Sequence, residues 1–149
     1  MSDHIRAMGV DLVEEAGDAR FLDATTIGTA DGRVWSADRV IIAAGGRASR
    51  LPIPGAELGL TYEGVRSLSA LPERVCIIGA ADTGCQLASI LANFGCRVWL
   101  LERGPRILSR ADKDVSAELE RAFRERGIEV IANASVEQLE QLEPGVRVV

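Results

Sequence analysis

The chain has 149 residues, of which 47% are hydrophobic and 26% charged, a balance typical of globular proteins and sufficient for one medium domain or two small ones. The formal net charge of −5 argues against nucleic-acid binding, which favours a basic surface. No apolar run approaches the ~20 residues of a membrane-spanning helix, and the charged N-terminus lacks the apolar core of a signal peptide, so we expect a cytoplasmic protein without a membrane partner.

The first third of the chain predicts β-structure. Asp31 and Gly32 form a pair suited to a tight hairpin turn, because both central positions of such a turn accept positive φ. The run 39–46, RVIIAAGG, is apolar and rich in β-branched residues, so we expect a buried strand that ends at two glycines. Prolines and glycines then gather in 51–72, which predicts a connector between two structural units, 1–50 and 73–149.

After Pro72 the pattern alternates between strands and helices. Apolar runs predict strands at 75–78, 98–101 and 128–132, and the final GVRVV predicts the opening of a fourth. The expected core faces of the two helices are Leu87, Ile90, Leu91 and Phe94 in the first, and Val115, Leu119, Ala122 and Phe123 in the second, which Asp112 caps. Such alternation predicts an α/β fold with a parallel sheet, whose ligands bind at the carboxyl ends of the strands.

The turn after the first of these strands carries small residues. Gly79, Ala81 and Gly84 occupy the three glycine positions of G-x-G-x-x-G, the pattern typical of Rossmann-like βαβαβ units that bind dinucleotides. Gly79 permits a tight turn, Ala81 adds a methyl where a pyrophosphate would approach, and Gly84 permits close packing of helix on strand. The helix N-terminus offers N–H groups to phosphates.

Glu102 ends the second strand, roughly 20 residues beyond the glycine turn, where an acid can accept hydrogen bonds from ribose hydroxyls. This carboxylate would repel a 2′-phosphate and favours NAD over NADP, whereas Arg103 and Arg106 favour the opposite preference. The alternative is an α/β unit whose glycines serve packing alone and whose Glu102 is merely solvated.

The three cysteines, Cys76, Cys85 and Cys96, lack CxxC or CxxxxC spacing, so we expect buried, reduced thiols. The one histidine, His4, lies near the N-terminus, and no spacing of ligands predicts a metal site.

Three blocks in this order, 39–58, 71–108 and 114–136, together resemble the pyridine nucleotide–disulfide oxidoreductases, the family of dihydrolipoamide dehydrogenase and mercuric reductase. The resemblance implies that 1–50 is a β-rich segment of an FAD-binding domain and 73–149 part of an NAD(P)-binding domain. It places Val136 near adenine and gives Asp82 either a charge near phosphate or a capping role. The residues expected to bind cofactor are Gly79, Ala80, Ala81, Asp82, Thr83, Gly84, Glu102, Arg103 and Val136.

The chain also departs from the family pattern. Ala44 stands where threonine is usual, Gln86 where glutamate is usual, and the family's N-terminal glycine motif, CxxxxC disulfide and C-terminal interface domain are absent. We therefore expect an NAD(H)-binding portion of a larger enzyme that moves hydride between nicotinamide and FAD, without catalytic residues of its own. The alternative is a non-catalytic nucleotide-binding or self-associating module that forms homo-oligomers through unpaired sheet edges.

Overall fold

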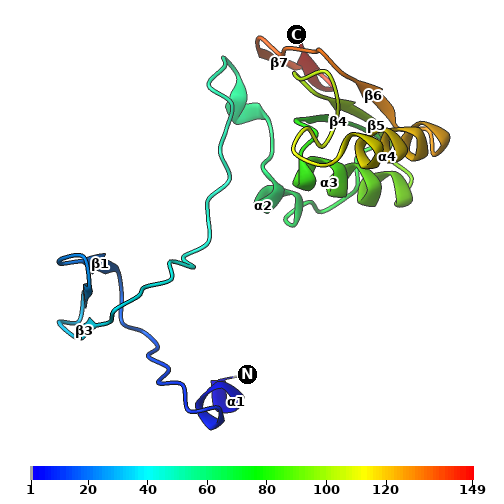
Figure 1. Ribbon diagram of the computed structural model, residues 1–149. Helices are drawn as coiled ribbons and strands as arrows, with labels where there is room; N and C mark the ends of the chain where they lie inside the picture. The colour runs from blue at the N-terminus through cyan, green and yellow to red at the C-terminus, as the bar shows by residue number, and fades with distance from the viewer. Residues whose placement is uncertain (1) are drawn as a thin grey trace. The chain divides into compact units, whose positions relative to one another are not determined.

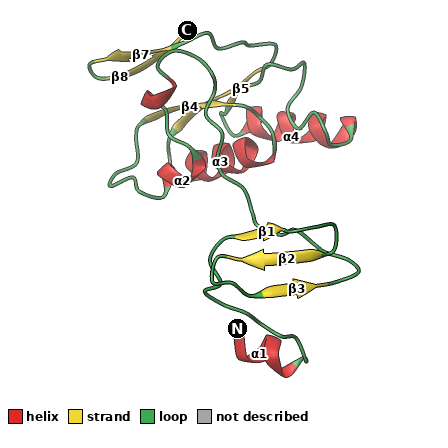
Figure 2. Cartoon of the chain, turned by 90° about the vertical axis from the view of Figure 1, so that its left-hand side faces the viewer, coloured by secondary structure: helices red, strands yellow, loops and turns green. Residues whose placement is uncertain are grey.

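The computed structural model describes residues 2–149, which divide into two compact units, one ending at Gly46 and the other spanning Arg47–Val149 (Figure 1). The first unit contains helix α1 (Ser2–Ala7) and strands β1 (Ala19–Phe21), β2 (Thr26–Thr29) and β3 (Val34–Ser36). Its strands form an antiparallel sheet in the order β1-β2-β3 (Figure 2).

The hairpin predicted around Asp31 and Gly32 is confirmed, since Ile27 pairs with Trp35 across β2 and β3. Its loop is longer than a two-residue turn, because the N–H of Thr29 donates to the carbonyl of Arg33 at 3.0 Å. Gly32 alone in this loop has positive φ, at +86°. A loop with one glycine in that region is the usual solution for three-residue hairpins.

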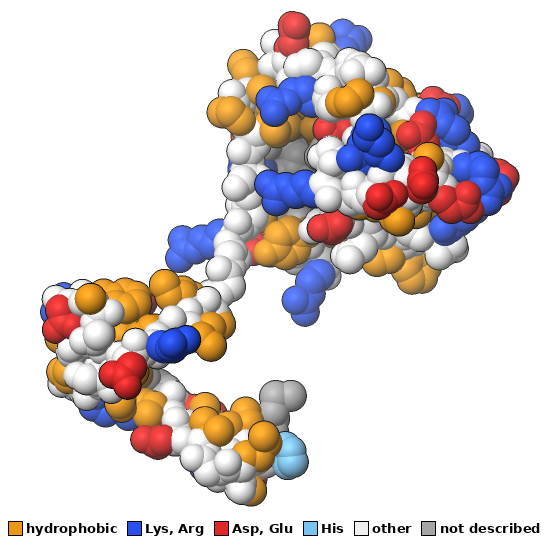
Figure 3. All heavy atoms as spheres, viewed as in Figure 1, with side chains coloured by type: hydrophobic (Ala, Val, Ile, Leu, Met, Phe, Trp, Pro, Cys, Tyr) orange, Lys and Arg blue, Asp and Glu red, His pale blue; other side chains and the backbone are white. Residues whose placement is uncertain are grey.

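The buried strand expected at 39–46 is wrong. The segment forms no strand, and the side chains of Ile41 and Ile42 are 92% and 74% exposed. A β-strand needs a neighbour to receive its N–H and C=O groups. In the part of this unit that the structure describes, the sheet contains only β1, β2 and β3. Hydrophobic side chains accordingly stand at the surface of the unit (Figure 3).

The second unit is built on a three-stranded parallel sheet in the order β4-β5-β6, from β4 (Arg74–Ile78), β5 (Arg97–Leu101) and β6 (Glu129–Ile131). Helix α3 (Asp82–Asn93) connects β4 to β5, and helix α4 (Lys113–Glu125) connects β5 to β6. The predicted βαβαβ order is therefore confirmed. Inward residues alternate along the strands, so Val98, Leu100 and Val130 are almost fully buried beneath the helices.

Small residues decide which face of α3 packs against the sheet. Cys85, Ala88 and Leu91 are buried, whereas Ile90 and Phe94, which were predicted in the core, are 48% and 68% exposed. Short side chains let a helix approach a sheet closely, so the packed face is narrower than the apolar pattern suggests.

The buried face of α4 differs from its prediction by one position. Val115, expected in the core, is 55% exposed, and Ser116 is buried instead. The Ser116 hydroxyl is satisfied by donating to the carbonyl of Ile107 at 2.6 Å. The predicted cap is confirmed, because the Asp112 carboxylate accepts the N–H of Asp114 at 2.8 Å. Glu120 and Arg124, one helical turn apart, form an ion pair at 2.8 Å.

The strand predicted at the chain end is present, but it lies outside the parallel sheet. Instead β8 (Gly145–Val148) pairs antiparallel with β7 (Leu139–Leu142), which the sequence did not predict (Figure 2). The connector is also ordered, with a short 3-10 helix η1 (Ala56–Leu58) and helix α2 (Tyr62–Val65). The carbonyl of Pro54 accepts the N–H of Leu139 at 2.9 Å and so ties the connector to β7. Among the described residues, no helix has the length and apolarity that a membrane crossing needs.

Candidate functional site

The glycine turn stands at the carboxyl end of β4. Gly79 has φ +99°, a conformation that L side chains rarely adopt, and its N–H donates to the carbonyl of Leu101 at 2.8 Å. A β-carbon on Gly84 would overlap the Gly79 carbonyl oxygen. The close packing predicted for Gly84 is thus confirmed, and the two glycines are needed for different reasons.

Helix α3 begins directly after this turn without a side-chain cap. Ala81 occupies the N-cap position in an extended conformation and, as alanine, has no oxygen with which to accept a hydrogen bond. The amides of Asp82, Thr83 and Gly84 belong to the first turn, where the helix itself provides no acceptor. Ala81, Asp82 and Thr83 are exposed, and the Asp82 carboxylate does not cap the helix. An oxyanion could therefore reach these amides, against the opposing charge of Asp82.

Glu102 follows β5 and turns its carboxylate toward the glycine turn. One oxygen accepts the N–H of Ala80 at 2.8 Å, and the other accepts the N–H of Gly104 at 2.7 Å. The side chain is half-buried, so each oxygen keeps a second lone-pair direction for a ligand hydroxyl. The turn after β4 and the acid after β5 thus meet at one edge of the sheet.

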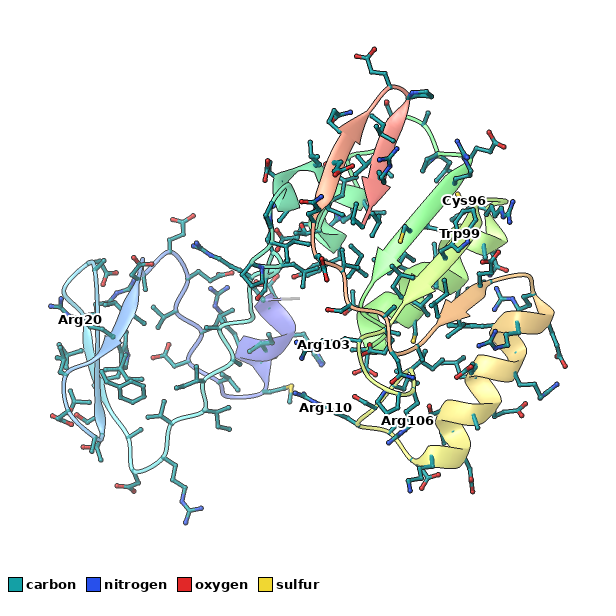
Figure 4. All side chains as sticks on the ribbon, turned by 90° about the horizontal axis from the view of Figure 1, so that it is seen from above. Arg20, Cys96, Trp99, Arg103, Arg106 and Arg110 are labelled. Atoms are coloured by element: carbon teal, nitrogen blue, oxygen red, sulfur yellow. The ribbon has the colours of Figure 1, made fainter. Side chains whose placement is uncertain are left out.

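The arginines of the loop after β5 differ in their contacts. Arg106 donates to the carbonyls of Leu108, Ser109 and Ala111 at 3.2, 2.6 and 3.1 Å, respectively. Arg103 is exposed, and Figure 4 labels both residues together with Arg110 on this loop.

Val136 is half-buried in the segment between β6 and β7. Two residues before it, the N–H of Ala134 donates to the carbonyl of Glu102 at 2.9 Å. The segment that carries Val136 therefore starts beside the same strand end as Glu102.

A cavity of about 590 Å³ flanks the glycine turn within the second unit. Its lining includes Gly79 and Thr83 at one end and apolar residues of β4, α3 and the β7–β8 hairpin elsewhere, such as Ile77, Leu87 and Val146. Glu102 does not line it. Ligands of such parallel sheets lie beyond the carboxyl ends of the strands, which is where the acid and the free amides converge.

Comparison with known proteins identifies the family of this chain. The family model described as pyridine nucleotide-disulphide oxidoreductase matches residues 4–149, almost the whole chain. The chain belongs to this family. The resemblance predicted from the three sequence blocks is confirmed.

Members of the pyridine nucleotide-disulphide oxidoreductase family are similar to this chain over most of its length. A glutathione reductase of Nostoc sp. is 31% identical over 94% of the chain, and a mercuric reductase of Lysinibacillus sphaericus is 33% identical over 89%. The solved HOCl-induced flavoprotein disulfide reductase RclA of Escherichia coli matches 89% of the chain with a TM-score of 0.67 and 29% identity. The chain spans 30%, 26% and 31% of these proteins, respectively.

The cysteines of this family member are free thiols in different surroundings. Cys85 and Cys96 are buried as predicted, but Cys76 is exposed, although partial burial still raises the pKa of its thiol. Burial, followed by the nearby charges of Asp82 and Glu102, raises the pKa of Cys85 to about 11. In residues 2–149 no cluster of His, Cys, Asp and Glu is arranged to hold a metal ion.

Two features of the site were not predicted from the sequence. Nothing in the pattern indicated that Arg106 would bind backbone carbonyls, or that Leu108 would adopt positive φ and donate to Ala80. Side-chain donors to irregular loops have no fixed spacing, so only the tertiary structure identifies them.

Proposed function

We propose that the chain forms the NAD(H)-binding portion of an FAD- and NAD(P)-dependent oxidoreductase that passes hydride between nicotinamide and flavin. The observation that carries the proposal is the meeting of Glu102 with the Gly79 turn and the uncapped start of α3 at one sheet edge. Membership of the family supports it, as does the similarity to RclA, which is described as a flavoprotein disulfide reductase.

The chain's own residues would bind and orient the dinucleotide. The nicotinamide, when bound, supplies the hydride chemistry. The amides of Asp82, Thr83 and Gly84 are available to a pyrophosphate, and the partial positive charge of the helix N-terminus attracts it. Glu102 would accept hydrogen bonds from the ribose hydroxyls with the same oxygens that accept the N–H groups of Ala80 and Gly104. Val136 would contact adenine, and we assign no general acid or base to this chain.

The same carboxylate favours NAD(H) over NADP(H). Glu102 is half-buried and fixed by two amides, so it cannot swing away from a 2′-phosphate without leaving those N–H groups unpaired. Arg103 is the exposed cation next to it in the sequence and could attract that phosphate. We propose that the fixed acid outweighs the exposed arginine.

Direct titration tests the proposal. NADH is added to the purified chain and its fluorescence is followed to saturation, with circular dichroism showing that the chain is folded. We expect saturable binding and a weaker affinity for NADPH. A folded chain that shows no saturation up to about 1 mM NADH contradicts the proposal.

The flavin belongs to the rest of the proposed assembly. We propose that residues 1–50 are a segment of the flavin domain, 51–72 a connector and 73–149 part of the nucleotide domain. Because 39–46 is open and forms no strand, this chain alone is expected to lose FAD during purification. A yellow preparation with bound FAD would show that the flavin site is more complete than proposed.

A second function is self-association through sheet edges. Strands β4 and β6 each pair on one side only in the described part of the chain, which leaves N–H and C=O groups free to pair with another copy. Light scattering over a hundredfold range of concentration separates the two functions. A mass that rises with concentration without NADH binding favours the self-associating module, and a constant monomer mass excludes it.

A further inference from the structure

One residue, Ala80, joins the glycine turn to the loop that follows β5. The N–H of Ala80 donates to Glu102 and the carbonyl of Ala80 accepts the N–H of Leu108, each at 2.8 Å. Ala80 is fully buried, and the Cys85 thiol also approaches its carbonyl at 3.4 Å. The orientation of this residue, and with it the start of α3, therefore depends on the loop 104–111.

Leu108 can donate to Ala80 only because the loop holds it in an unusual conformation. Its φ is +44°, a conformation that residues with a β-carbon rarely adopt. Its neighbour Ile107 is fully buried, and the Ile107 carbonyl accepts the Ser116 hydroxyl. These contacts anchor one side of Leu108.

Arg106 holds the other side. Its guanidinium donates to three carbonyls, those of Leu108, Ser109 and Ala111, and the N–H of Ala111 donates back to Leu108 at 2.8 Å. A planar guanidinium is suited to several acceptors at fixed angles, which a lysine ammonium cannot match. The loop arginines lie on the same side of the unit in Figure 4, yet Arg106 is the one with this set of carbonyl contacts.

We propose that Arg106 is a positioning residue for dinucleotide binding. It fixes the loop 104–111, so that Leu108 holds the carbonyl of Ala80 and the α3 amides stay aimed at the pyrophosphate. Because its donors are directed to backbone carbonyls, Arg106 does not receive a 2′-phosphate, and discrimination between the coenzymes falls to Glu102 and Arg103. This inference rests on the proposed function.

The test compares Arg106→Met with Arg103→Met, a matched change on the same loop. Dissociation constants for NADH and NADPH are measured with both variants and the unchanged chain. We expect Arg106→Met to weaken both coenzymes by the same factor, roughly tenfold, and the amide exchange of Leu108 to accelerate. Arg103→Met should weaken NADPH more than NADH, and it should leave that exchange unchanged. Arg106→Lys should lie between, and it keeps the test available if the methionine variant unfolds.

Each other outcome has a definite meaning. Selective loss of NADPH in Arg106→Met would make Arg106 a phosphate ligand and overturn the inference. A lower melting temperature with unchanged affinity for both coenzymes would make its role purely structural and overturn it as well. If the unchanged chain binds no NADH, the proposed function fails and the positioning role fails with it, a result distinct from normal binding by the Arg106 variants.

Discussion

Gly84 lies so close to Gly79 that a β-carbon on the former would overlap the carbonyl oxygen of the latter. Gly84→Ala therefore forces the start of α3 away from β4, and we expect a loss of about 2 kcal/mol or more in the free energy of unfolding. A β-carbon at position 79 would have no neighbouring atom within 4 Å, but the alanine of Gly79→Ala must adopt φ +99°. This conformation costs about 1–2 kcal/mol. Urea unfolding monitored by tryptophan fluorescence measures both. Gly46→Ala, with open space and an ordinary φ, is the control, and a Gly84→Ala chain as stable as the control would contradict the packing role.

Glu102→Gln tests the two hydrogen bonds that the Glu102 carboxylate accepts from backbone N–H groups. Glutamine preserves the shape of the side chain but presents an N–H₂ group to one of the two N–H donors, those of Ala80 or Gly104. We expect stability to fall by about 1 kcal/mol and NADH to bind roughly tenfold more weakly. Fluorescence titration and urea unfolding give the two values. Glu118→Gln, an exposed change on α4, should alter neither quantity appreciably. Unchanged NADH affinity in Glu102→Gln would remove the ribose role.

Asp82→Asn tests the charge at the start of α3. The carboxylate is exposed in the first helical turn, where it stabilises the helix but repels a pyrophosphate. We expect the asparagine variant to bind NADH several-fold more tightly, with a larger gain at low salt because screening weakens the repulsion. The matched control is Asp114→Asn, which removes the corresponding acid from α4. A decrease in affinity with Asp82→Asn would mean that this carboxylate assists binding.

The thiols should differ in reactivity. Burial raises the pKa of both Cys76 and Cys85, but Cys76 is exposed to reagents, whereas Cys96 is buried and the pKa of buried Cys85 is raised to about 11. At pH 8 roughly a thousandth of Cys85 is therefore thiolate. An alkylating reagent at pH 8 should label Cys76 first, and the other two only after unfolding. Mass spectrometry of peptides from the labelled chain locates the modification. Labelling of native Cys85 at a rate similar to Cys76 would contradict the buried position.

The β2–β3 hairpin should weaken in acid. Hydrogen bonds from the Arg33 side chain and then from the Thr29 hydroxyl hold the pKa of Asp31 well below its usual range. A lowered folded-state pKa means that the stabilisation is present above the ordinary aspartate pKa of about 3.9 and is lost as the pH falls below it. The amide chemical shifts of Thr29 and Arg33 follow this loss by NMR. Asp31→Asn should abolish the acid dependence, and an equal dependence in that variant would exclude Asp31 as its cause.

The carbonyl contacts of Arg106 show why part of the site could not be predicted from sequence. Residue spacing predicts the turn at Gly79, the close packing of Gly84 and the position of Glu102 at the end of a strand. These three features are local consequences of residue type. From sequence alone, an arginine near such an acid can be interpreted as a ligand of a 2′-phosphate just as well as a donor to loop carbonyls. Its use as a donor to three carbonyls depends on the path of the loop, which follows from the burial of Ile107.

The sequence by itself determined the β-hairpin, the parallel βαβαβ unit and the glycine turn with its acid, since periodicity and turn chemistry act over a few residues. Only the tertiary structure decided that Cys85 and Ala88 rather than Ile90 face the sheet, that 39–46 stays open, and that β8 pairs back on β7. The physical reason is that burial and strand pairing require a partner surface. Which surface lies near depends on contacts between residues distant in the chain.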